Sequence, residues 1–179
     1  MKWKLSKLVF SFVILGMVIP IHTTLLPNFV WFKEFGLINS HLALIIPYTA
    51  FFLAFSVLMF SGFLQSIPFA MEESAYLEGA GLPSILLKII APMTQAGFVT
   101  VGIMAFLNCW NEFVMANTFL TSEVKRTLPF SIIRFEGEYS ANYAVQFACM
   151  MIVAVIPITI YSVFSKQIIA GVTAGAVKG

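Results

Sequence analysis

The chain has 179 residues, of which 60% are hydrophobic and 10% are charged, and its formal net charge is +2. A soluble domain carries about 45–50% apolar and about 25% charged residues, so this composition excludes a water-soluble fold. A soluble enzyme, a nucleic-acid-binding protein and a secreted disulfide scaffold are excluded with it. The composition indicates a helical membrane protein.

Four stretches lack Asp, Glu, Lys and Arg and are long enough to cross a bilayer, because a spanning helix needs about 20 predominantly apolar residues. They cover residues 8–32, 35–71, 89–111 and 139–165. We therefore predict an all-α membrane protein, a single domain over residues 1–179 with about four transmembrane helices. The expected spans are about 8–26, 41–64, 93–115 and 143–164.

Prolines lie within or at the end of three of these spans. Pro20 is expected to kink the first span and Pro27 to end it, while Pro47 and Pro157 lie inside the second and the fourth. A proline frees the carbonyl four residues earlier, which neighbouring helices must satisfy inside a membrane.

Four spans place both termini and the loop 66–91 on one side of the membrane. Six of the ten Lys and Arg residues fall on that side, and four fall on the other. The side richer in Lys and Arg faces the cytoplasm. We therefore expect a multi-pass protein of the plasma (inner) membrane with both termini in the cytoplasm.

The residue types that carry catalysis or bind metals are sparse. Cys109 and Cys149 fall inside predicted spans and are interpreted as small packing residues. His22 and His41 flank the first outer loop without a nearby set of acidic or cysteine ligands, which favours an interfacial placement. We predict no catalytic residues, no metal site and no cofactor.

The loop 66–91 differs from the spans because it contains closely spaced prolines, glycines and acidic residues. Pro68 can begin a helix, and Glu72 and Glu73 follow in its early turns, where negative charge suits the helix dipole. Gly79 and Gly81 offer left-handed positions that would end this helix. A second short helix would run from Pro83 over residues 84–90, and Pro92 would end it.

This pattern predicts a helix–turn–helix on the cytoplasmic surface, with an acidic face formed by Glu72, Glu73 and Glu78. A helix that lies on lipid favours a face rich in Lys and Arg, whereas an acidic face suits a basic cleft on another protein. The loop is therefore interpreted as a docking element.

The spacing of the loop resembles the signature of ABC importer permeases, Glu-Ala-Ala-x3-Gly-x9-Ile-x-Leu-Pro. Here it reads Glu73, Ser74, Ala75, Gly79, Ile89, Ala91 and Pro92, with Ser74 and Ala91 in place of the usual Ala and Leu. The flanks are similar to the maltose-type carbohydrate permeases, for example Trp110-Asn111-Glu112-Phe113 and the ending Gly171 to Gly179. Members of that family typically have six spans, and this chain resembles their last four. Three alternatives would explain the missing first two spans: a natural short version, a mis-set start, or a split or decayed reading frame.

The resemblance implies a type I permease fold and a membrane subunit of an ATP-driven importer of a sugar or polyol. It implies a second permease, two cytoplasmic ATPase subunits and an extracytoplasmic solute-binding protein as partners. The residues assigned to ATPase docking are Glu73, Ser74, Ala75, Gly79, Ile89 and Pro92. The tail residues Gly175, Val177, Lys178 and Gly179 are expected to contact the ATPases, with a frayed terminus as the alternative.

A carboxylate inside a span usually faces a protein interior or an interface. Glu112 and its neighbours Trp110 and Asn111 are therefore candidates for the substrate path, with a position of Glu112 in the outer headgroups as the alternative. A secondary transporter or channel without an ATPase is the second candidate function. A membrane enzyme is the third, and the absence of GxSxG and HExxH motifs disfavours it.

Overall fold

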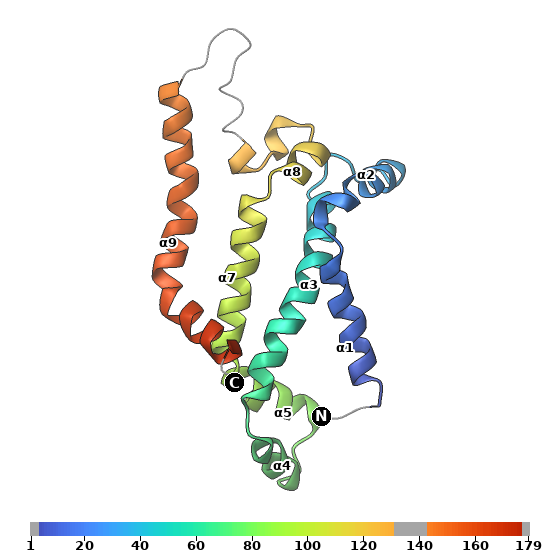
Figure 1. The fold of residues 1–179 in the computed structure, drawn as a ribbon, viewed down its shortest axis with the longest axis vertical. Helices are drawn as coiled ribbons and strands as arrows, with labels where there is room; N and C mark the ends of the chain where they lie inside the picture. Colours follow the sequence, from blue (N-terminus) through green and yellow to red (C-terminus); the bar gives the residue numbers. More distant parts are fainter. Residues whose placement is uncertain (1–3, 131–142, 177–179) are drawn as a thin grey trace.

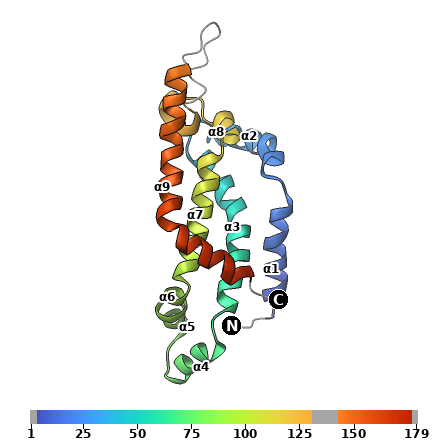
Figure 2. The same cartoon turned by 60° about the vertical axis from the view of Figure 1, so that its left-hand side comes forward.

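A computed structural model of the chain describes residues 4–130 and 143–176. In these ranges every regular element is helical, which confirms the predicted all-α fold. Four helices run along the long axis of the molecule (Figures 1 and 2). They are α1 (Ser6–Leu15), α3 (Leu42–Gln65), α7 (Gln95–Asn111) and α9 (Tyr143–Ala176). The last turns of α9 bend away from this axis (Figures 1 and 2).

Shorter helices lie at the two ends of this bundle. α2 (Leu25–Glu34) and α8 (Val114–Phe119) lie at one end, and α4 (Phe69–Leu77), α5 (Leu82–Ile85) and α6 (Ala91–Met93) lie at the other (Figures 1 and 2). The connections contain η1 (Gly16–Val18), η2 (Ile21–Thr24), η3 (Leu86–Ile90) and η4 (Glu123–Lys125). The start of α1 and the last turns of α9 lie toward the end that carries α4 and α5.

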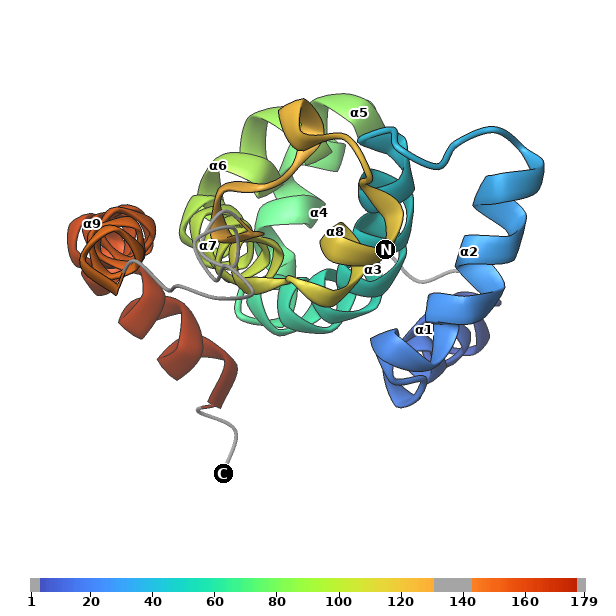
Figure 3. The same cartoon turned by 90° about the horizontal axis from the view of Figure 1, so that it is seen from above.

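The bundle is built around α3 and α7. α3 packs against α1, α7, α8 and α9, and α9 packs mainly against α7. The view from above places α1 and α9 on opposite sides of the α3–α7 pair (Figure 3). Gly97 of α7 permits a close approach to α3, because a Cβ atom there would lie 2.8 Å from the ring of Phe63. A side chain at position 97 would push α3 and α7 apart.

Two helical segments are long and apolar enough to cross a membrane, namely α3 and residues 143–167 of α9. Two bent pairs raise the number to four if each pair is one span. Residues 6–18 and 21–34 meet at 85°, and residues 82–93 and 95–111 meet at 72°. The predicted number of about four spans agrees with this upper value, while the limits of the individual spans stay predictions.

The first predicted span, 8–26, is not one straight helix. The chain is extended at Pro20, and α2 begins at Leu25 and continues to Glu34. The expectation that Pro27 ends a helix is wrong. Pro27 is the third residue of α2, where a backbone N–H would have no partner within the helix, so the proline is tolerated.

The third predicted span, 93–115, also differs from the expectation. The helix passes through Pro92 and breaks at Thr94, so the expected stop at Pro92 is wrong. The turn before the proline widens to i→i+5 bonding, with Ala91 N donating to Leu86 O. This wide turn gives the proline ring room against the carbonyl of Lys88. The chain breaks again after Asn111, where α7 ends.

The last helix is longer than predicted. α9 continues through Pro157 and past residue 164 to Ala176, so most of the glycine-rich tail is helical. The predicted tail contact at Gly175 lies on this helix. Val177, Lys178 and Gly179 lie outside the described residues, as does the segment 131–142.

Candidate functional site

Glu112 lies in the break between α7 and α8 and caps the second helix. Its backbone is extended, with ψ of 123°. The carboxylate accepts hydrogen bonds from Met115 N at 2.8 Å and from Ala116 N at 3.3 Å, which satisfies backbone groups at the start of α8. Tyr48 of α3 donates its hydroxyl to the same carboxylate. Glu112 therefore joins three elements of the fold.

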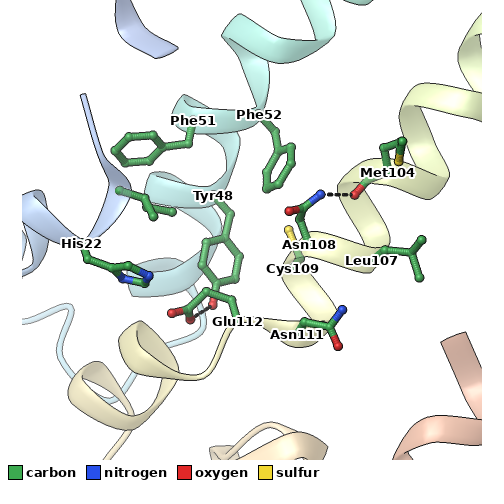
Figure 4. A pocket seen from close by; sticks show the side chains of 11 residues that line it. His22, Tyr48, Phe51, Phe52, Met104, Leu107, Asn108, Cys109, Asn111 and Glu112 are labelled. Atoms are coloured by element: carbon green, nitrogen blue, oxygen red, sulfur yellow. Dashed lines mark hydrogen bonds between the residues drawn. The ribbon is translucent and has the colours of Figure 1, made fainter. Parts of the chain in front are cut away.

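A hollow of about 580 Å³ opens beside this pair, between η2, α3 and α7 (Figure 4). This volume lies in the range of small-molecule sites, about 300–1,000 Å³. The polar and aromatic members of its wall are His22, Tyr48, Phe51, Phe52, Asn108, Asn111 and Glu112, and Ile21, Met104, Leu107 and Cys109 complete it.

Figure 4 shows how the side chains of this hollow are arranged. The ring of His22 lies on the side of the Tyr48–Glu112 pair, and Asn111 projects away from that pair. Asn108 donates its amide Nδ2 to the Met104 carbonyl at 2.8 Å, one turn earlier in α7. Asn111 and Glu112, which the sequence analysis assigned to a substrate path, both line this hollow.

Trp110 does not line this hollow. Its indole Nε1 donates to the Val153 carbonyl of α9 at 3.3 Å, and its ring lies 5.5 Å from that of Phe106. Val153 lies four residues before Pro157, so its carbonyl has no N–H partner in its own helix. Trp110 supplies the missing donor. Its position favours a role in joining α7 to α9 over one in the substrate path.

Asn39 fixes the connection between α2 and α3 to the segment after α8. It adopts a left-handed backbone with φ of 61°, and its N–H donates to Phe119 O at 2.7 Å. Its Oδ1 accepts from Thr121 N at 3.2 Å and Ser122 N at 2.8 Å. Its carbonyl accepts from Lys125 Nζ at 2.7 Å. One residue thus holds two segments about 80 positions apart.

At the other end of the molecule, α4 begins and ends as the sequence predicts. Pro68 precedes its first residue. Gly79 has φ of +83°, and Ala80 N donates to Ala75 O at 3.0 Å while Gly79 N donates to Tyr76 O at 3.0 Å. These two bonds form a Schellman motif, which needs a left-handed residue after the helix. Gly81 is not left-handed, with φ of −70°, because one such residue already turns the chain.

The residues assigned to docking divide into two groups. Ala75 is buried against Ile85 and Ile90, and Ile89 packs on the same cluster, so Ala75 and Ile89 hold the loop together from inside. Glu73 is exposed and makes no hydrogen bond or ion pair within the described residues. These positions suit Ala75 and Ile89 to shaping the loop and Glu73 to meeting a partner.

Two more of the assigned residues make only local contacts. The Ser74 hydroxyl donates to Ala70 O at 2.9 Å within α4. Pro92 lies exposed in α6. Around Glu73, the side chains of Tyr76 and Leu77 are 69% and 81% exposed, so the loop presents apolar area beside its acid.

Sequence reasoning missed three contributions to these sites. Tyr48 is a lone phenol within an apolar helix, and Asn108 is an amide near the end of α7. Polar groups in spans usually face an interior, so both could have been singled out. The role of Asn39 had a local signal, since asparagine is one of the few residues that adopt a left-handed backbone. Among the described residues, no group of His, Cys, Asp or Glu is placed to hold a metal ion.

Comparison with known proteins gives a match over most of the chain. The family described as "Binding-protein-dependent transport system inner membrane component" matches residues 1–171. The chain is 35% identical over 98% of its length to the sulfoquinovosyl glycerol transport system permease protein SmoH of Agrobacterium fabrum. It is 36% identical over 99% of its length to a putative ABC transporter permease protein of Caldicellulosiruptor sp..

A third relative is the melibiose/raffinose/stachyose import permease protein MelC of Bacillus subtilis, 31% identical over 98% of the chain. The chain covers 62%, 65% and 64% of the length of SmoH, the Caldicellulosiruptor protein and MelC respectively. It therefore spans somewhat less than two thirds of the length of these relatives.

Proposed function

The chain belongs to the family of inner membrane components of binding-protein-dependent transport systems, and on that premise we propose that it is the membrane-spanning subunit of an ATP-driven importer of a sugar or polyol. Several relatives carry sugar permease names, which supports this class of solute. Hydrolysis of ATP is assigned to partner subunits.

The observation that carries the proposal is the loop from α4 to α6. It projects beyond the bundle at the end away from α8 (Figure 1). It combines the carboxylate of Glu73, which has no partner among the described residues, with exposed Tyr76 and Leu77 on a helix too short to cross a membrane. An acid beside apolar area suits a cleft with a basic side chain. We assign this basic cleft to the ATPase.

The complete transporter would contain a second permease, two ATPase subunits and a solute-binding protein. Closure of the ATPases on ATP would draw the docking loops together, and the spans would then re-orient around the solute. A loop that transmits force in this way must be rigid, and the Schellman motif at Gly79 and the Ala75–Ile85–Ile90 cluster supply that rigidity.

The docking role is tested by retention of the ATPase on the permease. The chain is co-produced with the other subunits of its transport system, solubilised in detergent and captured. Truncation of one partner of a buried charge pair costs about 2–5 kcal/mol, which is roughly 30- to 5,000-fold in an equilibrium. Glu73→Ala should therefore lose the ATPase.

Glu34→Ala is the matched control, since Glu34 is an exposed carboxylate at the opposite end of the molecule. It should retain the ATPase. Full retention and full ATP-dependent uptake in the Glu73→Ala variant would contradict the docking role. Uptake by the native transporter without ATP would favour a secondary transporter or channel.

The proposed topology places Glu73 in the cytoplasm and Lys125 outside. Single cysteines at these two positions, in a chain whose own two cysteines are replaced by serine, would be labelled in intact cells with a membrane-impermeant maleimide. Labelling at 125 alone is expected. Labelling at 73 from outside would refute the docking assignment.

A further inference from the structure

The hollow between η2, α3 and α7 presents polar groups that the described part of the chain leaves open. The imidazole of His22 makes no hydrogen bond there, and Asn108 uses its Nδ2 on Met104 O and keeps its Oδ1 available. The rings of Phe51 and Phe52 line the same space (Figure 4). The hollow therefore offers both hydrogen-bonding groups and aromatic surface.

Tyr48 and Glu112 have a different part in this wall. The carboxylate is occupied by the Tyr48 hydroxyl and by two backbone N–H groups of α8. Its acceptor capacity is thus largely used by the protein itself. The pair holds the wall in position, and the groups left for a solute within the described residues include those of His22 and Asn108.

A second hollow, of about 440 Å³, lies on another side of Tyr48 and Phe52 and provides a comparison. Ile45, Leu53, Ala105 and Cys109 contribute to it, and Cys109 borders both hollows. The hydroxyl-bearing members of the second hollow are Thr49 and Ser56 besides Tyr48. The hydroxyl of Ser56 donates to Phe52 O at 2.6 Å within α3. It contains no amide and no imidazole, so it suits an apolar occupant such as lipid.

The geometry points to a sugar-binding subsite on this subunit, in which Asn108 and His22 bind hydroxyl groups and Phe51 and Phe52 contact the C–H face of the sugar ring. A sugar needs both kinds of contact, because its hydroxyls require hydrogen-bond partners when they leave water and its ring faces are apolar. The inference rests on the proposed function, since it takes the solute to be a sugar. The hollow lies toward the α8 end, which the proposed topology places outside.

The first test measures sugar selectivity, because general damage lowers the uptake of every sugar alike. Complete transporters in ATP-loaded vesicles are given labelled glucose, melibiose and trehalose. Loss of one hydrogen bond is worth about two- to tenfold. Asn108→Ala should change the ratio of uptake rates between sugars by about this factor. Asn117→Ala is the control, an exposed asparagine on α8 outside the hollow, and it should leave the ratios unchanged.

The second test uses Cys109, a free thiol in the wall of the hollow. In a Cys149→Ser background, N-ethylmaleimide should alkylate Cys109 more slowly when the transported sugar is present in excess. Asn108→Ala should weaken this protection, and Asn117→Ala should not.

The outcomes separate the two proposals. Unchanged uptake ratios in Asn108→Ala, together with alkylation that no sugar slows, would overturn the subsite while ATP-dependent sugar uptake stands. Uptake of these sugars by the native transporter without ATP would instead overturn the proposed function.

Discussion

At the α8 end of the molecule Met115 and Phe119 are fully buried, whereas in the α4–α6 loop Tyr76 and Leu77 are 69% and 81% exposed. The ring of Phe119 meets that of Phe32 edge-on at 5.3 Å, and Asn39 ties the surrounding segments together. The loop has a small core, in which Ala75, Ile85 and Ile90 are buried and Ile67, Ala80 and Ile89 pack against them.

This difference indicates that the two ends obtain their stability from different sources. The α8 end has a buried apolar cluster and backbone turns that are hydrogen-bonded within the chain, while Trp31, Phe35 and Val124 at its surface are exposed. The loop has a locally fixed turn and exposed apolar side chains beside Glu73, an acid without a partner in the described part of the chain. Substitutions at the α8 end should therefore act on folding, and substitutions on the loop should act on association.

The largest effect is expected for Phe119→Ala. Phe119 is fully buried in the cluster that joins α2, α3 and α8, and truncation of a buried phenylalanine costs about 3–5 kcal/mol because it leaves a cavity. Unfolding by SDS in mixed micelles should shift by this amount. Leu77→Ala is the control, since Leu77 is 81% exposed, and it should shift the unfolding curve little. Equal shifts in the two variants would contradict the comparison.

Asn39→Ala should destabilise the same end by about 2–3 kcal/mol. The change removes the acceptor for Thr121 N and Ser122 N, and alanine tolerates the left-handed backbone at this position less well than asparagine does. Asn39→Asp keeps an oxygen acceptor and should lose much less. If both variants unfold like the native protein, Asn39 does not fix this end.

The third prediction concerns the turn of the loop. Gly79→Ala should cost about 1–2 kcal/mol, because φ is +83°, although no atom lies within 4 Å of the added Cβ. Gly79→Asn tolerates the left-handed conformation and should restore most of the loss. Retention of the ATPase on the captured permease is the measurement. Equal retention in the alanine and asparagine variants would show that backbone conformation is not the cause.

The sequence predicted the features that depend on neighbouring residues. Pro68 and Gly79 mark the start and end of α4, because helix initiation and a left-handed turn are local properties. Pro27 was misplaced because its effect depends on where the helix begins, and that is decided by the break at Pro20. A proline in a first turn is harmless, whereas the same residue further along kinks the helix or ends it.

The roles of Trp110 and Glu112 depended on contacts between distant segments. Trp110 binds the carbonyl that Pro157 leaves free, 43 positions away. Glu112 was expected on the substrate path or among headgroups, and its carboxylate caps α8 and binds Tyr48 at the edge of a hollow. Neither contact has a signal in spacing or composition, so the structure was needed to find them.

The smallest effect is expected for Ser74→Ala, which tests whether the docking face includes this hydroxyl. Ser74 stands where the family signature has alanine, and its hydroxyl donates to Ala70 O within α4. Such a bond to a carbonyl one turn back contributes little to a helix and can bend it, and alanine has the higher helix propensity. Ser74→Ala should therefore change the stability of the loop by no more than about 0.5 kcal/mol and leave ATPase retention unchanged. A marked loss of the ATPase in this variant would mean that the hydroxyl turns outward to the partner in the assembled transporter.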